Sequence, residues 1–424
     1  MGTEISEEQK LKRNRLAFAV TLGHTIKHIF MSSLPLLLSM LKVDPRFSIN
    51  ATQYGIIAAA DKGAAGATTM VAGYLGERYA HKSGALLFLS LSLMGIAYFF
   101  LGNAASFLWI VIIMLLAGIG PALYHPPAIA SLSRKFPDRR GFAISLHGMG
   151  GAIGSMLGPV LIGILTIESF DSDIISIGKL FNLSWDQILK ISVIPAIFFA
   201  ILVYLLMKNI PVVQTKTESI RDYFGDLKKL LKDKQMMGLI SVTGLRAFSQ
   251  SSIMYFLPLY LIADPLDGGL GKNTLTAGMF LSGAQVIGVF TQPVLGWASD
   301  RYSRKQVLLP SMGVLSICFF TLTFASDGYQ LILNIIVMGA FLYSLHAIFI
   351  AAAMDVAKGE AQSTVVSLIY GASFIGSMSP IFAGMIVDEF GLKYAFSYCG
   401  VIALISTIIF GLLKLPSKSN DIPN

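Results

Sequence analysis

Long apolar runs recur along the chain, and they limit its fold more than any other feature of the sequence. Twelve such runs, each of about 20 residues or more, alternate with short segments that contain charged residues, glycine and proline. A run of this length crosses a hydrocarbon core of about 30 Å as an α-helix. The hydrophobic fraction of 54% and the charged fraction of 13% lie outside the range of soluble globular proteins. We therefore predict an all-α membrane protein with twelve transmembrane helices.

The spans are placed by apolar length and by the glycine, proline and charged residues between them. The predicted spans are 16–41, 54–76, 84–103, 106–131, 141–167, 187–208, 237–262, 275–298, 306–325, 329–354, 362–387 and 394–414. The first 15 residues are polar and mixed in charge, with no small-residue cleavage site after them. We expect the first apolar run to be a retained helix and not a signal peptide.

The distribution of positive charge predicts the topology. Most of the 32 Lys and Arg residues fall in predicted segments on the same side as the amino terminus. Because cytoplasmic loops carry the excess of Lys and Arg, we expect both termini to lie in the cytoplasm of a multi-pass protein of the cell membrane. The excess of basic residues in cytoplasmic loops then accounts for the net charge of +8. We therefore expect no nucleic acid as a partner.

The chain contains an internal repeat. The segment Gly73–Lys82 returns in similar form as Gly296–Lys305, at an offset of 223 residues, and each copy has a glycine, an acid followed by arginine, and two basic residues at its end. The same offset relates three further pairs, Pro35 and Pro258, Gly55 and Gly278, and Gly148 and Gly371. One offset that recurs in separate segments indicates two copies of one unit.

The repeat predicts the domain organisation. An even number of spans separates the two copies, so the halves have the same orientation and are related by an axis along the membrane normal. We expect one six-helix bundle over residues 1–208, a cytoplasmic linker over 209–236, and a second six-helix bundle over 237–424. Apolar and basic residues of the linker recur at helical spacing, which predicts an amphipathic helix on the inner leaflet. A solvated linker is the alternative interpretation.

Twelve spans, the parallel repeat and the motif in the loops after spans 2 and 8 resemble the major facilitator superfamily of secondary transporters. The first copy supplies the glycine, acid and arginine of the family's motif as Gly73, Glu77 and Arg78. The second copy is the closer match, with Gly296, Asp300, Arg301 and Arg304. Both copies lie at predicted inner ends of spans and form a candidate cytoplasmic gate, in which we expect the second copy to matter more.

A glycine-rich stripe in span 5 looks like the glycine–proline motif of the superfamily's drug antiporters. It consists of Gly150, Gly154, Gly158 and Pro159, and span 11 echoes it with Gly376 and Pro380. Glycines four residues apart on a helix face let another backbone approach closely, and proline can bend the helix. The alternative interpretation is tight packing without any bearing on the direction of transport.

A narrower resemblance rests on the tetrapeptide Leu-Tyr-His-Pro at 123–126, the basic loop after it and the histidines of span 1. These features are similar to the fosmidomycin-resistance group of efflux proteins within the superfamily. The resemblance implies export of a small molecule.

Charged residues inside spans cost several kcal/mol each at the helix centre, which makes them candidates for function. The candidate residues on the substrate or proton pathway are His24, Lys27, His28, Asp61, Lys62, His125, His147, Arg246 and His346. Three of them, His24, Lys27 and His28, share one face of span 1. For each histidine, an interhelical hydrogen bond without a role in transport is the alternative interpretation.

Asp61 is the only acid well inside a predicted span. A carboxylate balanced between desolvation and a neighbouring lysine can load and release a proton, so we hypothesise that Asp61 couples transport to protons. A permanent salt bridge between spans 1 and 2 is the alternative. Because Lys27, Lys62 and Arg246 outnumber Asp61, we expect the cavity to be positive and the substrate to carry an anionic group.

The sequence contains no phosphate-binding loop and no recognisable catalytic triad, so we expect neither direct ATP drive nor an enzyme. Cys318 and Cys399 lie in apolar segments and imply no disulfide and no metal site, and no cofactor is expected. We predict a monomeric, proton-coupled exporter of a small organic molecule that works by alternating access in the lipid bilayer. The alternatives are an importer or facilitator of organic anions and, in another class, a non-transporting receptor or signalling protein.

Overall fold

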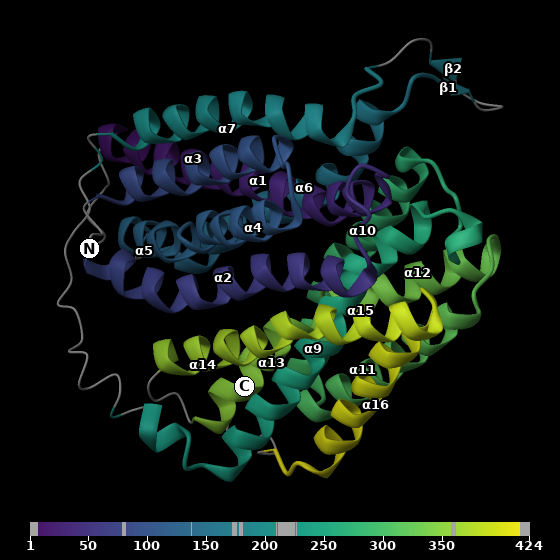
Figure 1. Ribbon diagram of the computed structural model, residues 1–424. Helices are drawn as coiled ribbons and strands as arrows, with labels where there is room; N and C mark the ends of the chain where they lie inside the picture. Colours follow the sequence, from purple (N-terminus) through teal and green to yellow (C-terminus); the bar gives the residue numbers. More distant parts are fainter. Residues whose placement is uncertain are drawn as a thin grey trace. The chain divides into compact units, whose positions relative to one another are not determined.

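The computed structural model describes residues 7–78, 82–136, 138–171, 176–177, 181–208, 210, 225, 227–357 and 362–415. The described chain is almost entirely α-helical (Figure 1), which confirms the predicted fold class. A short antiparallel pair, β1 (Phe170–Asp171) with β2 (Ser176–Ile177), lies between the helix that ends at Thr166 and the helix that begins at Trp185. The predicted amphipathic helix of the linker falls mostly on residues outside the described ranges.

The chain divides into two compact units. The first comprises residues 1–48, 60–217 and 273–282, and the second comprises 49–59, 218–272 and 283–424. Each unit thus consists mainly of one half of the sequence and includes one short segment from the other half. The predicted bundle boundaries at 208 and 237 stay a prediction.

Seven helices of the described residues come from the first half of the sequence. They are α1 (Glu7–Val43), α2 (Ala51–Arg78), α3 (Ser83–Gly102), α4 (Phe107–Ala122), α5 (His125–Lys135), α6 (Arg140–Thr166) and α7 (Trp185–Met207). The second half contributes α9 (Lys234–Ile262), η2 (Pro265–Asp267), α10 (Thr274–Arg301), α11 (Arg304–Phe324), α12 (Tyr329–Leu342), α13 (Leu345–Val356), α14 (Gln362–Ile375), η3 (Gly376–Met378), α15 (Ser379–Phe390) and α16 (Tyr394–Leu412).

Within the described residues, 10 helical segments are long and apolar enough to cross a membrane. The predicted spans missing from this set correspond to α2 and α9, which carry Asp61, Lys62 and Arg246 in their interiors. Charged residues lower the mean hydropathy of the helices that hold them. The total of twelve membrane spans therefore stays a prediction.

Three spans that the sequence predicts as continuous helices are interrupted in the structure. α4 ends at Ala122 and α5 begins at His125, directly before Pro126 and Pro127. Proline lacks an amide hydrogen and disfavours a helical conformation in the residue before it, which explains this break. α12 ends at Leu342 and α13 begins at Leu345.

The third interruption affects the echo of the glycine–proline motif. Gly376 lies in the short 3₁₀ helix η3, and Pro380 lies in the first turn of α15, where proline is well tolerated. Pro159, by contrast, lies inside the continuous helix α6. The two motifs are therefore alike in sequence but differ in backbone structure.

Helices α1 and α6 approach each other closely because the glycines of α6 leave no side chains between the two backbones. A Cβ atom on Gly154 would lie 2.1 Å from the carbonyl oxygen of Thr25, and one on Gly150 would lie 2.6 Å from that of Thr21. A Cβ atom on Gly158 would lie 2.1 Å from Ser32 Oγ. Small residues at four-residue spacing permit this kind of packing in membranes.

A polar cluster joins the carboxyl end of α1 to the amino end of α7. Arg46 Nη2 donates a hydrogen bond to Asp44 Oδ2 over 2.6 Å, and Trp185 Nε1 donates to the same oxygen over 2.8 Å. The hydrogen bonds from Arg46, followed by the one from Trp185, lower the pKa of Asp44 to about 2. The carboxylate is thus ionised throughout the physiological pH range and holds the loop after α1 against α7.

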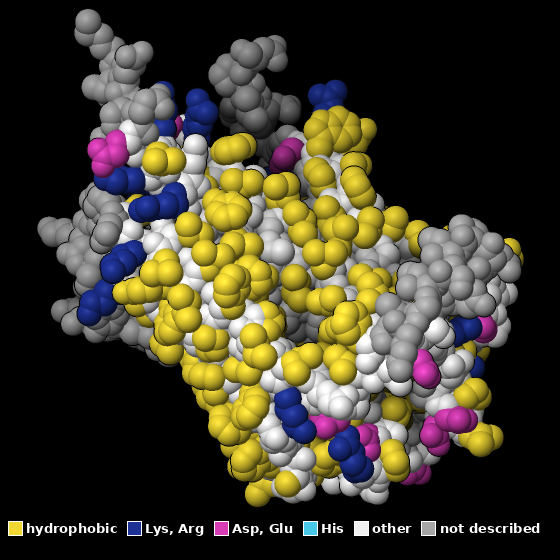
Figure 2. Space-filling view, turned by 90° about the horizontal axis from the view of Figure 1, so that it is seen from above, with side chains coloured by type: hydrophobic (Ala, Val, Ile, Leu, Met, Phe, Trp, Pro, Cys, Tyr) yellow, Lys and Arg dark blue, Asp and Glu magenta, His cyan; other side chains and the backbone are white. Residues whose placement is uncertain are grey.

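Hydrophobic side chains cover much of the face shown in Figure 2, and charged side chains lie toward its edges. Large apolar residues with more than half of their surface exposed occur on several helices, among them Leu108, Ile112, Ile194, Phe198, Phe290, Ile317 and Leu333. Soluble proteins rarely expose apolar patches larger than a few hundred Å². In a bilayer such side chains face lipid, in agreement with a membrane protein.

The packing of α1 on α6 predicts unequal effects of the same substitution at two glycines of α6. We expect Gly154→Ala to lower the stability of the folded protein by about 1–3 kcal/mol, because its methyl group would overlap the backbone of α1. Gly148→Ala is the matched control, since a Cβ atom there meets no atom within 4 Å. Thermal unfolding of the purified variants in detergent measures both. Equal melting temperatures for the two variants would contradict the role of the glycine stripe.

Candidate functional site

The first unit brings together five of the residues singled out from the sequence. His24, Lys27 and His28 project from α1, His125 is the first residue of α5, and His147 comes from α6. We call these five residues the histidine cluster. The ring centroid of His24 lies 3.7 Å from that of His147, 4.5 Å from that of His28 and 4.8 Å from that of His125. The cluster therefore joins three helices at one point.

Hydrogen bonds fix most of the cluster. His24 Nδ1 lies 2.6 Å from the carbonyl oxygen of His147, and His28 Nδ1 lies 2.9 Å from Ser155 Oγ. Lys27 Nζ lies 2.5 Å from His125 Nε2, and the lysine donates in this pair. His24 Nε2 and both ring nitrogens of His147 are buried without a hydrogen-bond partner among the described residues.

Local sequence explains why these side chains meet. Residues three and four apart share a helix face, which aligns Lys27 and His28 with His24. The helix break before Pro126 places His125 at the start of α5. Gly151 makes room for the ring of His24, because a Cβ atom there would lie 2.5 Å from His24 Cε1. The histidine cluster thus depends on the same glycine-rich helix that packs on α1.

Lys27 is buried, with 2% of its surface exposed, and no carboxylate of the described residues lies at ion-pair distance from its amine. The acid predicted near it, Asp61, pairs instead with its neighbour on α2, with 3.5 Å between Asp61 Oδ2 and Lys62 Nζ. The Asp61 side chain is 8% exposed and that of Lys62 is 33% exposed. This pair fits either a proton-loading acid or a permanent salt bridge.

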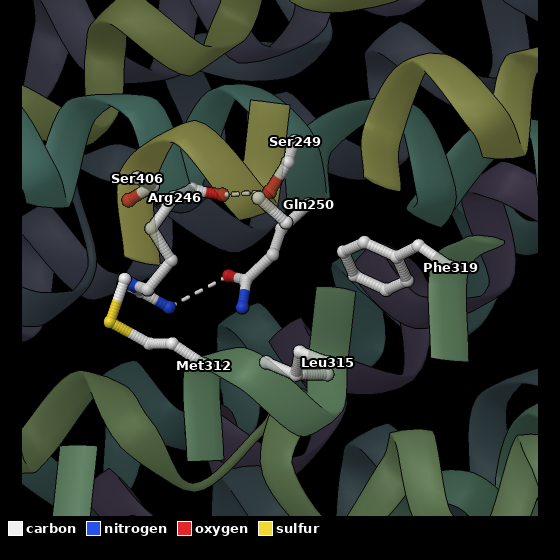
Figure 3. A pocket seen from close by; sticks show the side chains of 8 residues that line it. Arg246, Ser249, Gln250, Met312, Leu315, Phe319 and Ser406 are labelled. Atoms are coloured by element: carbon white, nitrogen blue, oxygen red, sulfur yellow. Dashed lines mark hydrogen bonds between the residues drawn. The ribbon is translucent and has the colours of Figure 1, made fainter. Parts of the chain in front are cut away.

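The second unit contains a buried arginine on α9, shown in Figure 3. Arg246 Nη1 donates a hydrogen bond to Gln250 Oε1 over 2.7 Å, and Arg246 Nη2 lies 3.3 Å from Nδ1 of His346 on α13. The guanidinium carbon lies 5.0 Å from the ring centroid of Phe349, within the range of a cation–π interaction. Arg246 is therefore held by neutral groups.

Arg246 has 6% of its surface exposed, and its Nε atom has no hydrogen-bond partner in the described chain. The described residues supply no carboxylate at ion-pair distance from it. The adjoining cavity in Figure 3, lined by Ser249, Met312 and Phe319 among others, has a volume of about 10 Å³, room for about one water molecule. A buried guanidinium without an anion is costly, and its planar donors match carboxylate and phosphate groups.

Three contributors to these sites were not predicted as site residues from the sequence, because they are uncharged. Gln250 lies four residues after Arg246 on the same helix face, and at the repeat offset of 223 residues from Lys27, which could have revealed it. Tyr124 stacks beside His24, with ring centroids 5.9 Å apart, and Ser155 bonds to His28. Tyr124 and Ser155 lie next to residues that were singled out, but no feature of their own predicts a role in the site.

The structure shows the second copy of the repeated motif in detail. Arg304 Nη1 bonds to Asp300 Oδ1 over 2.5 Å, and Arg304 Nε bonds to Asp355 Oδ2 on α13 over 2.9 Å. Arg301 is exposed, and a Cβ atom on Gly296 would meet nothing within 4 Å. In the first copy, Gly73 lies within α2, and the side chains of Glu77 and Arg78 lie outside the described part of the structure. The gating role of both copies stays a prediction.

The first unit contains a larger cavity than the one beside Arg246. It has a volume of about 410 Å³ and lies among α1, α3, α6 and α7. Its lining is almost entirely apolar, with Ile29, Leu161 and Ile188 as typical members. None of the residues of the histidine cluster lines it. Its polar lining residues, Ser33, Tyr98 and Ser192, are uncharged, so none of its lining side chains would pair with a charged ligand.

Comparison with known proteins assigns the family. The model of the Major Facilitator Superfamily matches residues 16–290 and 266–424, which together span nearly the whole chain. The chain belongs to the Major Facilitator Superfamily. It is therefore a multi-pass transporter of the plasma membrane and not an enzyme.

Its relatives in the superfamily include the fosmidomycin resistance protein of Escherichia coli strain K12, with 23% identity over 397 residues, 92% of this chain and 90% of that protein. The multidrug resistance protein MdtG of Enterobacter lignolyticus is 22% identical over 338 residues, 78% of this chain and 75% of that protein. The resemblance to the fosmidomycin-resistance group that the sequence analysis noted is thereby confirmed.

Solved superfamily structures show the same fold. A bacterial homolog of the human lysosomal transporter Spinster, in an inward-facing and unoccupied conformation, matches with a TM-score of 0.77 and 16% identity over 95% of this chain and 97% of that chain. The nucleoside transporter NupG matches with a TM-score of 0.74 and 14% identity over 95% of this chain and 98% of that chain. At these identities the likeness concerns the fold alone.

The surroundings of Arg246 predict an unusual gain in stability. We expect Arg246→Met to raise the melting temperature in the absence of substrate, by a stabilisation of about 1–4 kcal/mol, because an apolar side chain removes a buried charge that has no anionic partner. Thermal unfolding in detergent without added anions measures the effect. Arg304→Met is the control and should not stabilise, because it breaks the contacts to Asp300 and Asp355. A destabilised Arg246→Met variant would show that this charge is satisfied in the resting protein.

Proposed function

We propose that this superfamily member exports a small organic molecule with an anionic group, in exchange for protons, by alternating access of two six-helix halves. The observation that carries the proposal is Arg246, a buried guanidinium held only by neutral groups among the described residues. We further propose a monomer with both termini in the cytoplasm, as the positive-inside bias predicts.

The anionic character of the substrate follows from the balance of buried charge. Lys27 in the first unit and Arg246 in the second are each buried beside a histidine, without a described carboxylate at ion-pair distance. Charge buried in a membrane protein is retained where it serves a ligand or an ion. A carboxylate, phosphate or phosphonate on the substrate would supply the missing partner through charge-assisted hydrogen bonds.

Proton coupling is assigned to Asp61. Its carboxylate is nearly buried and pairs with Lys62, so protonation would break an ion pair inside α2. Access from the two sides of the membrane would then alternate between states that favour the protonated and the ionised acid. Export as the direction is supported by the names of the relatives, which are resistance proteins.

Two other functions remain as competitors. An importer or facilitator of organic anions would use the same buried cations without an opposing proton movement. A receptor or signalling protein with this fold would bind the anion and show no flux. Transport measurements on the purified protein in liposomes separate the three.

The first experiment tests the substrate class. Proteoliposomes with a trapped pH-sensitive dye are exposed to panels of organic carboxylates, organic phosphonates and organic cations. We expect members of the anionic panels to drive proton movement, and Arg246→Met to reduce the rate at least about tenfold, the loss of roughly one charge-assisted hydrogen bond. Lys234→Met is the control, because it removes an exposed basic residue from the first turn of the same helix, outside the pocket. Proton movement with cations alone would refute the anionic substrate.

The second experiment tests the coupling residue. We expect Asp61→Asn to abolish substrate accumulation driven by a pH gradient, while exchange of labelled for unlabelled substrate across the membrane continues. The exchange assay serves as the internal control for folding. If the variant keeps its response to the pH gradient, Asp61 forms a permanent salt bridge and another group carries the proton.

A further inference from the structure

We propose that His24, His28 and His125 form a binding site for a divalent transition metal ion of the Zn²⁺ type. One ring nitrogen from each histidine lies within 4.8 Å of the others, and the three come from two helices, α1 and α5. Neutral imidazole is a preferred ligand of Zn²⁺ and of its neighbours in the first transition row. The inference goes beyond the proposed function and does not depend on it.

The hydrogen bonds around two of these rings already have the pattern of metal ligands. His24 Nδ1 bonds to the carbonyl oxygen of His147 over 2.6 Å, which leaves the lone pair of its Nε2 free. That nitrogen is buried and has no partner in the described chain. His28 Nδ1 likewise bonds to Ser155 Oγ over 2.9 Å. Histidines that bind metals commonly hold their second nitrogen in this way, which fixes tautomer and orientation.

The geometry requires a small contraction. Bonds of about 2.0–2.1 Å from Zn²⁺ to tetrahedral nitrogen ligands place the donor atoms about 3.4 Å apart. From separations of at most 4.8 Å, the three nitrogens would therefore approach one another by up to about 1.4 Å. His28 and His125 are only partly buried, so their rings have space to rotate. Three protein ligands also leave a fourth position open for water or another ligand.

Lys27 competes with the metal for the same site. Its amine bonds to His125 Nε2 over 2.5 Å and places a positive charge beside the three rings. Metal binding would have to displace this amine, so the wild-type site should bind more weakly than three histidines alone. Replacing Lys27 by an apolar side chain of similar length should release His125 and remove the repulsion.

The two cysteines, which lie in apolar segments, predicted no metal site. The ligands His28 and His125 are separated by 97 positions, which matches no short metal-binding motif. Only the packing of α1 against α5 and α6 brings the rings together. The proposed site is thus a product of tertiary structure.

The test is a titration of the full-length, tag-free protein in detergent with Co²⁺, monitored by visible absorption. Co²⁺ absorbs strongly in this region when its nitrogen ligands are tetrahedral. Zn²⁺ is then added to displace the bound Co²⁺. We expect a signal that Zn²⁺ abolishes. His24→Ala and His28→Ala should each weaken binding at least about tenfold. Lys27→Met should strengthen binding at least about tenfold, a direction that loss of folding cannot mimic.

His346→Ala is the matched control, since it removes a partly buried histidine of the second unit that lies outside the proposed site. Its Co²⁺ titration should match that of the wild type. The proposal is overturned if neither the wild type nor Lys27→Met gives a Zn²⁺-displaceable signal. It is also overturned if the signal survives in both His24→Ala and His28→Ala, or if Lys27→Met leaves the affinity unchanged.

Discussion

The high cost of placing an unpaired charge in a hydrocarbon environment governs this molecule. Most helices meet that constraint by being apolar, so that lipid can cover their outer faces. Lys27 and Arg246 do not meet it, because each is buried and held by uncharged groups. In the proposed function, a bound anion would offset the cost of burying these two charges, which makes Lys27 and Arg246 the best candidates for substrate recognition.

The packing of the α6 backbone against α1 shapes the surroundings of His24. The glycines of α6 bring its backbone against α1, and the carbonyl oxygen of His147 then accepts from His24. A larger residue at Gly151 would occupy the space of the His24 ring. A motif that resembles a general packing device therefore also shapes the polar interior of the first unit.

Much of the fold could be predicted from the sequence, since apolar run length and the repeat report directly on membrane spans. The charged candidates were also found from sequence, because charge is rare in such helices and easily seen. Their partners were not. Ser155 and Tyr124 contribute a hydrogen bond and a ring contact that depend on the packing of distant helices. Gln250 lies on the same helix as Arg246, but it is uncharged, and uncharged polar residues are common in the chain. The breaks at Tyr124 and Ser344 were missed because apolar content continues through them.

Those breaks lie beside the two buried cations. In each unit the histidine that contacts the buried cation sits at the beginning of the half-helix after the break: His125 opens α5 and contacts Lys27, and His346 is the second residue of α13 and contacts Arg246. Each half-helix is thus tied to a cation at its pivot. An anion that draws the cation away from its histidine would free the half-helix to tilt about the break.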